Sequence, residues 1–194
     1  MAINLSKGQT ISLKKDNDAG LTKIRMGVGW DPIKKGGFLG GLFGGDNSID
    51  LDASCVVIDN SRQPIDAVWF SQLESRDGAI RHSGDNLTGD GDGDDEVIFV
   101  DLTSLPDNVQ HLVFTVNSFR GQTFNEVENA FCRLVDDTNN KEMARLVLSE
   151  KGEHTGLVMA VISRNGGTWE MRAVGHTTTA RTINDMLPDI VEAL

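Results

Sequence analysis

Short apolar runs separated by turn residues set the strongest limit on how this chain of 194 residues can fold. Residues 22–30, TKIRMGVGW, alternate large apolar or β-branched side chains with Lys, Arg and Gly, and that period of two is typical of a strand with one buried face. Similar runs recur at residues 49–58, 97–100, 112–116, 131–135, 145–148, 157–162 and 168–174. Many short strands with closely spaced turns predict an all-β-dominated fold, an antiparallel β-sandwich.

Two turns and one helix complete the expected layout. Asn165-Gly166-Gly167 predicts a hairpin turn, and residues 136–141, DDTNNK, predict another. Apolar residues near the C-terminus recur at helical spacing; they are Ile183, Met186, Leu187, Ile190, Val191 and Leu194. Pro188 is expected to kink or restart this short helix. Because there is no Pro-rich linker and no sustained repeat, residues 1–194 are expected to form a single domain.

The composition narrows the classes of function. The formal net charge of −11 and the pI near 4.7 argue against binding to nucleic-acid phosphate and favour cations or a basic partner surface. The N-terminal residues lack the apolar core of a signal peptide, and no apolar run is long enough to span a membrane. Cys55 and Cys132 both lie in apolar segments, which predicts buried, reduced thiols.

An acidic, glycine-rich run at residues 84–97, GDNLTGDGDGDDEV, contains no basic residue. Its acids are Asp85, Asp90, Asp92, Asp94, Asp95 and Glu96. At an effective dielectric of about 20, two such charges about 6 Å apart repel by about 3 kcal/mol, so a fixed loop would need a cation. The alternating glycines let the backbone turn tightly and aim its carbonyls inward. Carboxylates, carbonyls and the Asn86 amide are the oxygen ligands that calcium prefers, and the run has no His or Cys for zinc or copper.

A second acidic cluster is expected to complete this site. The run does not fit the EF-hand spacing and is flanked by strands, and a single Gly-Asp copy cannot stack as a β-roll. Alternation along the strand at 49–58 instead puts Asp50, Asp52 and Ser54 on one face, with the neighbouring apolar side chains on the other. Asp31, near the end of the preceding strand, is a further candidate ligand.

Several motifs together closely resemble the TerD-type family of tellurium-resistance and general stress proteins. They are GWDP (29–32), IDLDAS (49–54), GDNLTGDGDGDDEVIFVDL (84–102), VFTV (113–116), NKEMARLVLSE (140–150) and WEMRAVG (169–175). The resemblance implies a cytoplasmic bacterial β-sandwich, encoded among tellurite-resistance or stress genes, that binds Ca²⁺, usually two ions, in a shared acidic cavity. It implies no enzymatic activity. Asp50, Asp52 and the acids from Asp85 to Glu96 would hold the metal.

A glycine-rich insertion at residues 36–48 departs from the family pattern. Residues 36–45 read GGFLGGLFGG, which is either a flexible insertion or an apolar tip. Its side chains Phe38, Leu39, Leu42 and Phe43 could contact a partner protein or a membrane surface. It is not a phosphate-binding P-loop, because no Gly-Lys-Ser/Thr follows.

Three functions are therefore open. The first is a non-enzymatic calcium-binding stress protein, in which calcium orders the acidic loop for a protein partner, such as another tellurium-resistance protein. The second is a Mg²⁺- or Mn²⁺-dependent phosphohydrolase that uses the same acids. The third is a calcium-triggered membrane binder. The scattered histidines (82, 111, 154 and 176) have no nucleophile at recognisable spacing, and neither G-x-S-x-G nor HExxH occurs.

Overall fold

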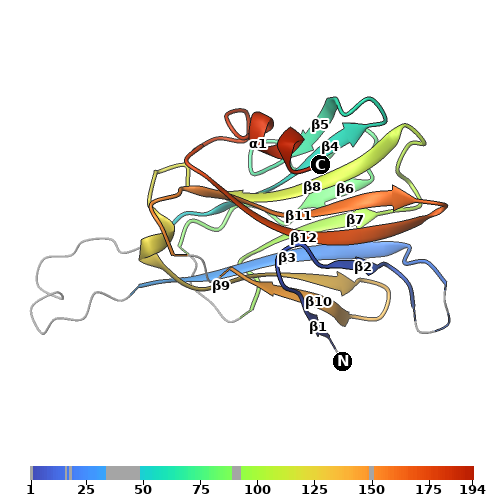
Figure 1. Cartoon of the computed structure of the whole chain (residues 1–194), viewed down its shortest axis with the longest axis horizontal. Coiled ribbons are helices and arrows are strands. Elements are labelled where there is room, and N and C mark those ends of the chain that lie inside the picture. Colours follow the sequence, from blue (N-terminus) through green and yellow to red (C-terminus); the bar gives the residue numbers. More distant parts are fainter. Residues whose placement is uncertain (1, 16, 18, 34–48, 89–92, 149–150) are drawn as a thin grey trace, which may run out of the picture.

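A computed structural model describes residues 2–15, 17, 19–33, 49–88, 93–148 and 151–194 (Figure 1). Its strands form two six-stranded sheets that lie one over the other. In order, the first sheet is β1 (Ile3–Asn4), β10 (Lys141–Val147), β9 (Val127–Asp136), β3 (Lys23–Pro32), β7 (Glu96–Asp101) and β6 (Ile80–His82). The second is β2 (Thr10–Ser12), β12 (Thr168–Thr178), β11 (Gly156–Asn165), β8 (Val109–Asn117), β4 (Asp52–Asp59) and β5 (Pro64–Val68).

The strand pairing confirms the antiparallel β-sandwich. Among the described strands only β1 and β10 pair in parallel. Asn165 pairs with Thr168 across the β11–β12 hairpin, and its central residues Gly166 and Gly167 have φ of 53° and 86°. Positive φ at both central residues is what a tight type I′ turn needs, so glycine fits there. Asp136 pairs with Lys141 across the other predicted turn.

Four short strands were not visible in the sequence pattern. They are β1, β2, β5 and β6, with two to five residues each. Segments of this length span too few alternations to show a period of two. Their positions are set by pairing with longer neighbours, as β6 pairs with β7.

The main hydrophobic core lies between the sheets. On β3 the alternation places Ile24, Met26, Val28 and Trp30 in this core, as predicted. Cys55 and Cys132 are buried there as free thiols, and burial raises the pKa of Cys132 to about 12.

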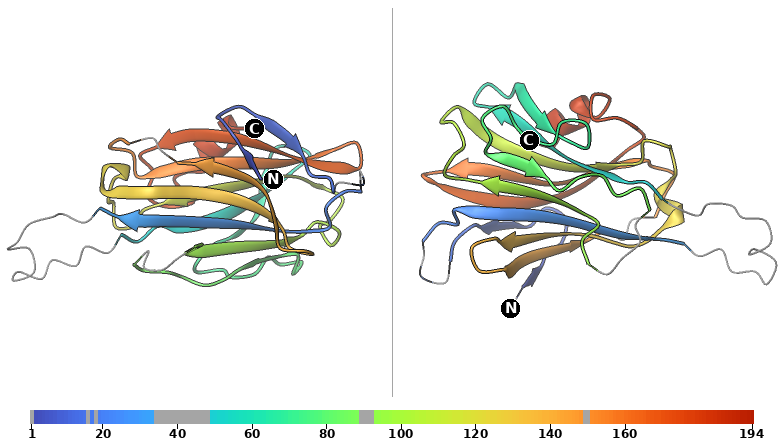
Figure 2. Two further views of the ribbon diagram at one scale, coloured as in Figure 1. Left: turned by 90° about the horizontal axis from the view of Figure 1, so that it is seen from below. Right: turned by 180° about the vertical axis from the view of Figure 1, so that it is seen from behind.

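A second hydrophobic cluster covers the outer face of the second sheet. Val56 and Ile58 of β4 contribute to it, whereas Cys55 and Val57 of the same strand belong to the main core. Its cover is the C-terminal segment, whose buried residues are Ile183, Met186 and Ile190. That segment contains the short helix α1 (Leu187–Glu192), with Pro188 in its first turn (Figure 2). Because both faces of β4 are covered, its sequence changes from alternating to continuously apolar.

No helix in the described ranges is long and apolar enough to cross a membrane. The glycine-rich insertion, with Phe38, Leu39, Leu42 and Phe43, lies outside the described residues, and so do Asp90 and Asp92. The expectations for these residues stay predictions.

Candidate metal site

Three carboxylates converge where β4 begins and where the chain leaves β6. Asp50 and Asp52 are buried, with 6% and 4% of their surface exposed, and Asp85 is exposed. An oxygen atom from each lies within 4.8 Å of those of the other two. The alternation of β4 is as predicted, because Leu51, Ala53 and Cys55 point into the main core. The aspartates therefore point to the other face of the strand, and they are buried there instead of lying on the surface.

The electrostatics of this cluster are unfavourable without a cation. Burial, together with the charges of Asp50, Glu96 and Asp85, raises the pKa of Asp52 to about 7. Burial is also the main cause of the raised pKa values of Asp50 and Asp85. Asp50 Oδ1 and Asp52 Oδ2 are buried and have no hydrogen-bond partner among the described residues. Among the described residues Arg120 brings a positive charge to the cluster, with its Nε 3.0 Å from Asp50 Oδ2.

Glu96 ties the start of the acidic loop to β4. Its side chain is fully buried; Oε2 accepts a hydrogen bond from Ala53 N at 2.7 Å, and Oε1 accepts one from Asn86 N at 3.1 Å. His82 Nε2 lies 3.3 Å from Glu96 Oε2 and 3.1 Å from the Ala53 carbonyl oxygen. Because Gly84 N donates to His82 Nδ1 at 3.1 Å, the ring hydrogen is on Nε2 in the neutral form. Glu96 and His82 thus position the loop beside Asp52.

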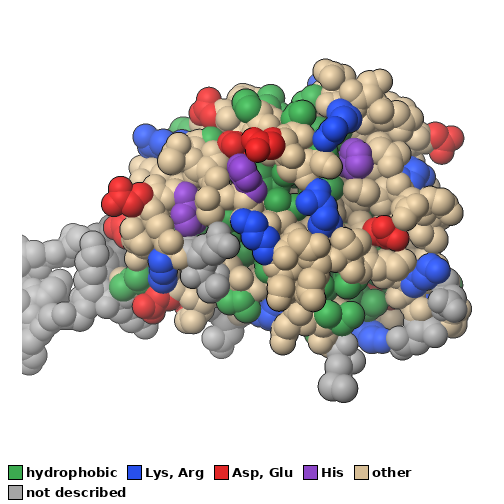
Figure 3. Space-filling view, in the orientation of Figure 1, with side chains coloured by type: hydrophobic (Ala, Val, Ile, Leu, Met, Phe, Trp, Pro, Cys, Tyr) green, Lys and Arg blue, Asp and Glu red, His purple; other side chains and the backbone are tan. Residues whose placement is uncertain are grey.

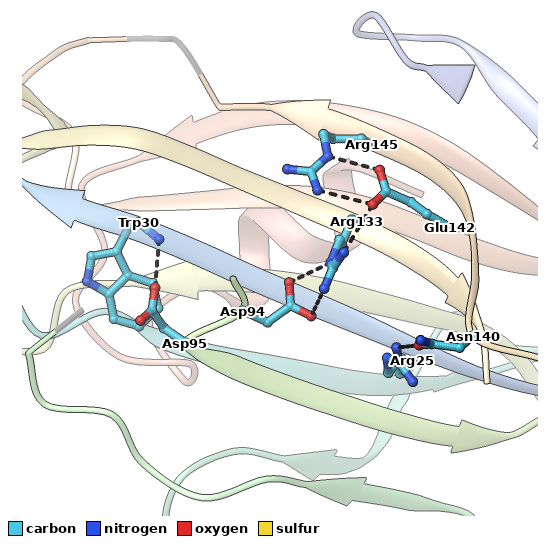
Figure 4. A network of polar contacts seen from close by, with 8 residues as sticks. All are labelled: Arg25, Trp30, Asp94, Asp95, Arg133, Asn140, Glu142 and Arg145. Atoms are coloured by element: carbon cyan, nitrogen blue, oxygen red, sulfur yellow. Dashed lines mark hydrogen bonds and ion pairs between the residues drawn. The ribbon is translucent and has the colours of Figure 1, made fainter. Parts of the chain in front are cut away.

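Asp95 connects the other end of the loop to β3. Its Oδ2 accepts a hydrogen bond from Trp30 N at 2.9 Å (Figure 4). Its Oδ1 accepts one from Asn86 Nδ2 at 3.1 Å. Burial is the main cause of its raised pKa, and the charges of Asp31, Glu96 and Asp94 add to it. Asp95 therefore links Asn86, and with it the start of the loop, to β3.

Asp94 points away from this cluster toward the first sheet. Arg133 donates to it from Nε at 2.7 Å and from Nη2 at 2.9 Å, a two-bond pairing visible in Figure 4. The carboxylate lies over Gly27, where a Cβ would come within 2.2 Å of Asp94 Oδ2, so only glycine fits at residue 27. The structure gives Asp94 a positive partner from its own chain.

Asp31 also has another partner, because Asn129 Nδ2 donates to its Oδ2 at 2.7 Å and its side chain is exposed. Of the ten predicted metal ligands, three converge directly: Asp50, Asp52 and Asp85. Asn86, Asp95 and Glu96 are linked to one another by hydrogen bonds, and the charge of Glu96 raises the pKa of all three aspartates. Asp31 and Asp94 have the partners given above, and Asp90 and Asp92 lie outside the described residues.

Two arginines at the site were missed by the sequence reasoning. Arg120 lies 70 positions after Asp50, and Arg133 lies 39 positions after Asp94. Neither residue stands in a basic cluster or near an acidic motif, so no local signal pointed to it. Only the pairing of β3 with β9, which carries Arg133, brings that side chain to the loop.

These observations define a class: a two-sheet β-sandwich in which buried aspartates of β4 and an acidic loop form a candidate oxygen-ligand cation site. A family model described as the TerD domain matches residues 1–189, and the chain belongs to this family.

Similar proteins agree with this assignment. The chain is 59% identical over 192 residues to the tellurium resistance protein TerZ of Serratia marcescens, covering 99% of this chain and 98% of that one. It is 43% identical to the stress response protein SCP2 of Bacillus subtilis, covering 96% and 98%. A solved structure of a homologue of the telluride resistance protein TerD from Streptomyces coelicolor has the same fold, with a TM-score of 0.70 at 20% identity, covering 87% of this chain and 96% of that chain.

Proposed function

We propose that this protein is a non-enzymatic, calcium-binding member of the TerD domain family that acts in bacterial stress response and tellurite resistance. The observation that carries the proposal is the convergence of Asp50, Asp52 and Asp85 within 4.8 Å. Two buried oxygens of this cluster have no hydrogen-bond donor among the described residues. A buried, unpaired carboxylate is costly, and a divalent cation would supply the missing positive charge.

The donor set fits calcium. The three converging side chains offer only carboxylate oxygens, the ligand type that calcium prefers over nitrogen or sulfur. Bound calcium would neutralise charge and order the loop against β4. Asp90 and Asp92 lie in the same loop, and with Asp95 they are the candidates for completing the shell and for holding a second ion.

A surface beside the site supports a role in binding a protein partner. The backbone N–H of Phe119 donates to the Asp52 carboxylate, and the next residue, Arg120, is paired with Asp50. Phe119 is 54% exposed, and with Asp52, Trp69 and Phe70 it lines a cavity of about 250 Å³. Neutralising the two aspartates would therefore change the contacts of this exposed aromatic edge. We propose that it engages a cytoplasmic protein partner, such as another tellurium-resistance protein, when calcium is bound.

A metal-dependent phosphohydrolase is the second candidate, because Arg120 places a half-exposed positive charge next to the acidic cluster. Such a charge could hold a phosphate near a metal. The relatives described above carry names of resistance and stress proteins and no enzyme name, which favours the first candidate. Absence of Mg²⁺- or Mn²⁺-dependent turnover across a panel of phosphoesters would exclude the second.

Thermal unfolding in EDTA and in millimolar calcium tests the first candidate. At a calcium concentration a hundred times the Kd, linkage predicts about 2.7 kcal/mol of stabilisation. For a domain of this size that corresponds to a rise in Tm of roughly 5–10 °C. The substitution Asp52→Asn should remove most of the rise, whereas Asp107→Asn, at an exposed loop position, should keep it. Equal Tm values of the unsubstituted protein in EDTA and in calcium would refute the proposal.

A further inference from the structure

A second group of potential metal ligands lies at the C-terminal helix. His176 of β12 and Asp189 and Glu192 of α1 each offer one ligand atom, and these atoms lie within 4.8 Å of one another. His176 Nε2 is 3.3 Å from Asp189 Oδ1. Figure 3 shows a histidine beside an acidic patch in the region where Figure 1 places α1. The group thus combines one imidazole with two carboxylates, unlike the all-carboxylate cluster near β4.

The register of β12 against β11 places the imidazole on the face of the sheet that the helix covers. Ala173 pairs with Ala160, but His176 pairs with Val158, so β12 has one more residue than β11 over this interval. Gly175 takes up the extra length at a φ of 63°. Val158 belongs to the second hydrophobic cluster, which lies under the C-terminal segment. Directly paired residues of antiparallel strands point to the same face, so His176 lies on the face of the sheet that α1 covers.

The helix is fixed over that face by its own contacts. Ile190 is fully buried in the second hydrophobic cluster, and Arg172 of β12 donates to the carbonyl of Ala193 just after the helix. Asp189 and Glu192 are one helical turn apart, so their side chains emerge on the same side. Two acids on a packed helix are thus presented to a histidine on the strand beneath it.

We propose that His176, Asp189 and Glu192 form a binding site for a borderline divalent cation such as Zn²⁺. Metal–ligand bonds of about 2.0–2.2 Å place tetrahedral ligands roughly 3.4 Å apart. His176 Nε2 and Asp189 Oδ1, 3.3 Å apart, already meet this spacing. Glu192 is exposed, so rotation of its side chain can bring its carboxylate to the same point. Three protein ligands leave one position for water or for a partner's side chain.

The nitrogen ligand separates this site from the proposed calcium site. Calcium takes oxygen ligands, whereas imidazole suits zinc, nickel, copper and cobalt. A metal here would join α1 to β12 and hold the cover of the second hydrophobic cluster in place. This inference does not depend on calcium binding near β4.

Isothermal titration of the calcium-saturated, full-length protein with ZnCl₂ tests the site. We expect one zinc ion whose affinity falls at least about tenfold in His176→Ala and in Asp189→Asn, because loss of a direct ligand should cost no less than loss of an outer-shell partner. His111→Ala is the matched control; its ring Nδ1 lies 2.8 Å from Ser163 Oγ, and this variant should bind zinc as the unsubstituted protein does. Equal zinc affinity in the unsubstituted protein and in both site variants, or no zinc binding at all, would overturn the proposal.

Amide hydrogen exchange distinguishes a metal site from a simple ion pair between His176 and Asp189, because only a metal site makes the exchange depend on zinc. Zinc should slow exchange of the α1 amides, including that of Ile190, whose N–H donates to the Met186 carbonyl. The slowing should be lost in Asp189→Asn, which keeps the helix and the shape of the side chain. Exchange in α1 that does not respond to zinc in the unsubstituted protein would contradict a site that bridges the helix and the strand.

Discussion

Asp94 and Asp52 belong to the same predicted acidic constellation, yet their surroundings are opposite. The side chain of Asp94 is 7% exposed and receives two hydrogen bonds from Arg133, whose pKa is raised mainly by this contact. Asp52 is also buried, but its charged neighbours are Asp50, Glu96 and Asp85, and its pKa is raised to about 7. The chain therefore supplies a cation for Asp94, whereas no described residue supplies one for Asp52.

The sheet that each aspartate faces explains the difference. Asp94 lies over Gly27 of β3, where the missing side chain leaves room for the carboxylate to reach Arg133 on the adjacent strand β9. Asp52 stands on β4, next to the fully buried Glu96, which already accepts hydrogen bonds from the backbone. Charge density in the sequence alone thus does not tell which of these two aspartates has a basic partner in the fold.

The largest effect is expected from removing Arg133, the basic partner of Asp94. Arg133→Ala leaves Asp94 buried and unpaired, and breaking such a pair costs about 3 kcal/mol. The loss should be equal in EDTA and in calcium if Asp94 takes no part in calcium binding. Urea unfolding in both conditions measures it.

The control for that test is Lys23→Ala. Lys23 is 58% exposed and lies 3.6 Å from Asp101, so its removal should cost less than about 1 kcal/mol. If Arg133→Ala were no more destabilising than this control, the Asp94–Arg133 pair would not be the stabilising contact that its geometry indicates. A loss that differs between calcium and EDTA would instead place Asp94 among the metal ligands.

The pH dependence of stability tests the second aspartate of the comparison, Asp52. The pKa of Asp52 is raised from 3.8 to about 7, so between these values the folded state binds a proton that the unfolded state has lost. The free energy of unfolding of the calcium-free protein should therefore fall as pH rises from about 4 to 7. We expect a fall of about 2 kcal/mol, about half of what the full shift of Asp52 represents, because part of that shift comes from the charges of Asp50 and Asp85, whose own pKa values are raised.

Asp52→Asn should flatten this fall, and the calcium-free variant should be more stable than the unsubstituted protein at pH 8. Urea unfolding in EDTA at several pH values measures both effects. Asp101→Asn is the contrasting variant, because the pKa of Asp101 is lowered, mainly by its hydrogen bond to Thr103. Asp101 stabilises the fold above pH 4, and its removal should not stabilise the protein. A calcium-free stability that rises through this pH range would contradict the assignment of Asp52.

The sequence predicted the sandwich because its long strands carry their own signal. The alternation on β3 and the Asn-Gly-Gly turn are local patterns that backbone geometry alone requires. The two-residue β1 and the three-residue β6 carry no such pattern, since pairing with neighbours far along the chain defines them.

The candidate site was predictable in part for the same reason. Alternation placed Asp50 and Asp52 on one face of a strand, and the structure brings Asp85 to them. Alternation could not show that this face is buried, because the residues packed around the two aspartates, Asp85, Glu96, Phe119 and Arg120, come from distant parts of the chain. Nor could alternation distinguish Asp94 from Asp95, which are adjacent in sequence. In the structure Asp94 points to Arg133, whereas Asp95 points to Trp30.

The smallest expected effect is that of replacing Arg120. Its partner Asp50 is intermediate between Asp94, which has a partly buried basic partner, and Asp52, which has none among the described residues. Arg120 pairs with Asp50 as Arg133 pairs with Asp94, and its Nε lies 3.0 Å from Asp50 Oδ2. The side chain of Arg120, however, is 46% exposed. Because Arg120 would compete with calcium for this oxygen, Arg120→Gln should raise calcium affinity by about two- to fivefold, the equivalent of roughly 0.5–1 kcal/mol. Calorimetric calcium titration measures this change. Arg76→Gln, at a position 81% exposed near Asp66, should leave the affinity unchanged.

The sign of the Arg120 effect separates two roles for an arginine beside an acid. Without calcium, Arg120→Gln should lower stability slightly, because Arg120 is the charge that lowers the pKa of Asp50 against the effect of burial. With calcium, the same substitution should increase the stabilisation that calcium provides. Arg133→Ala, by contrast, should destabilise both states alike. If Arg120→Gln weakened calcium binding, Arg120 would hold Asp50 in position for the metal, and Asp50 and Asp94 would then share a dependence on an internal cation that Asp52 lacks.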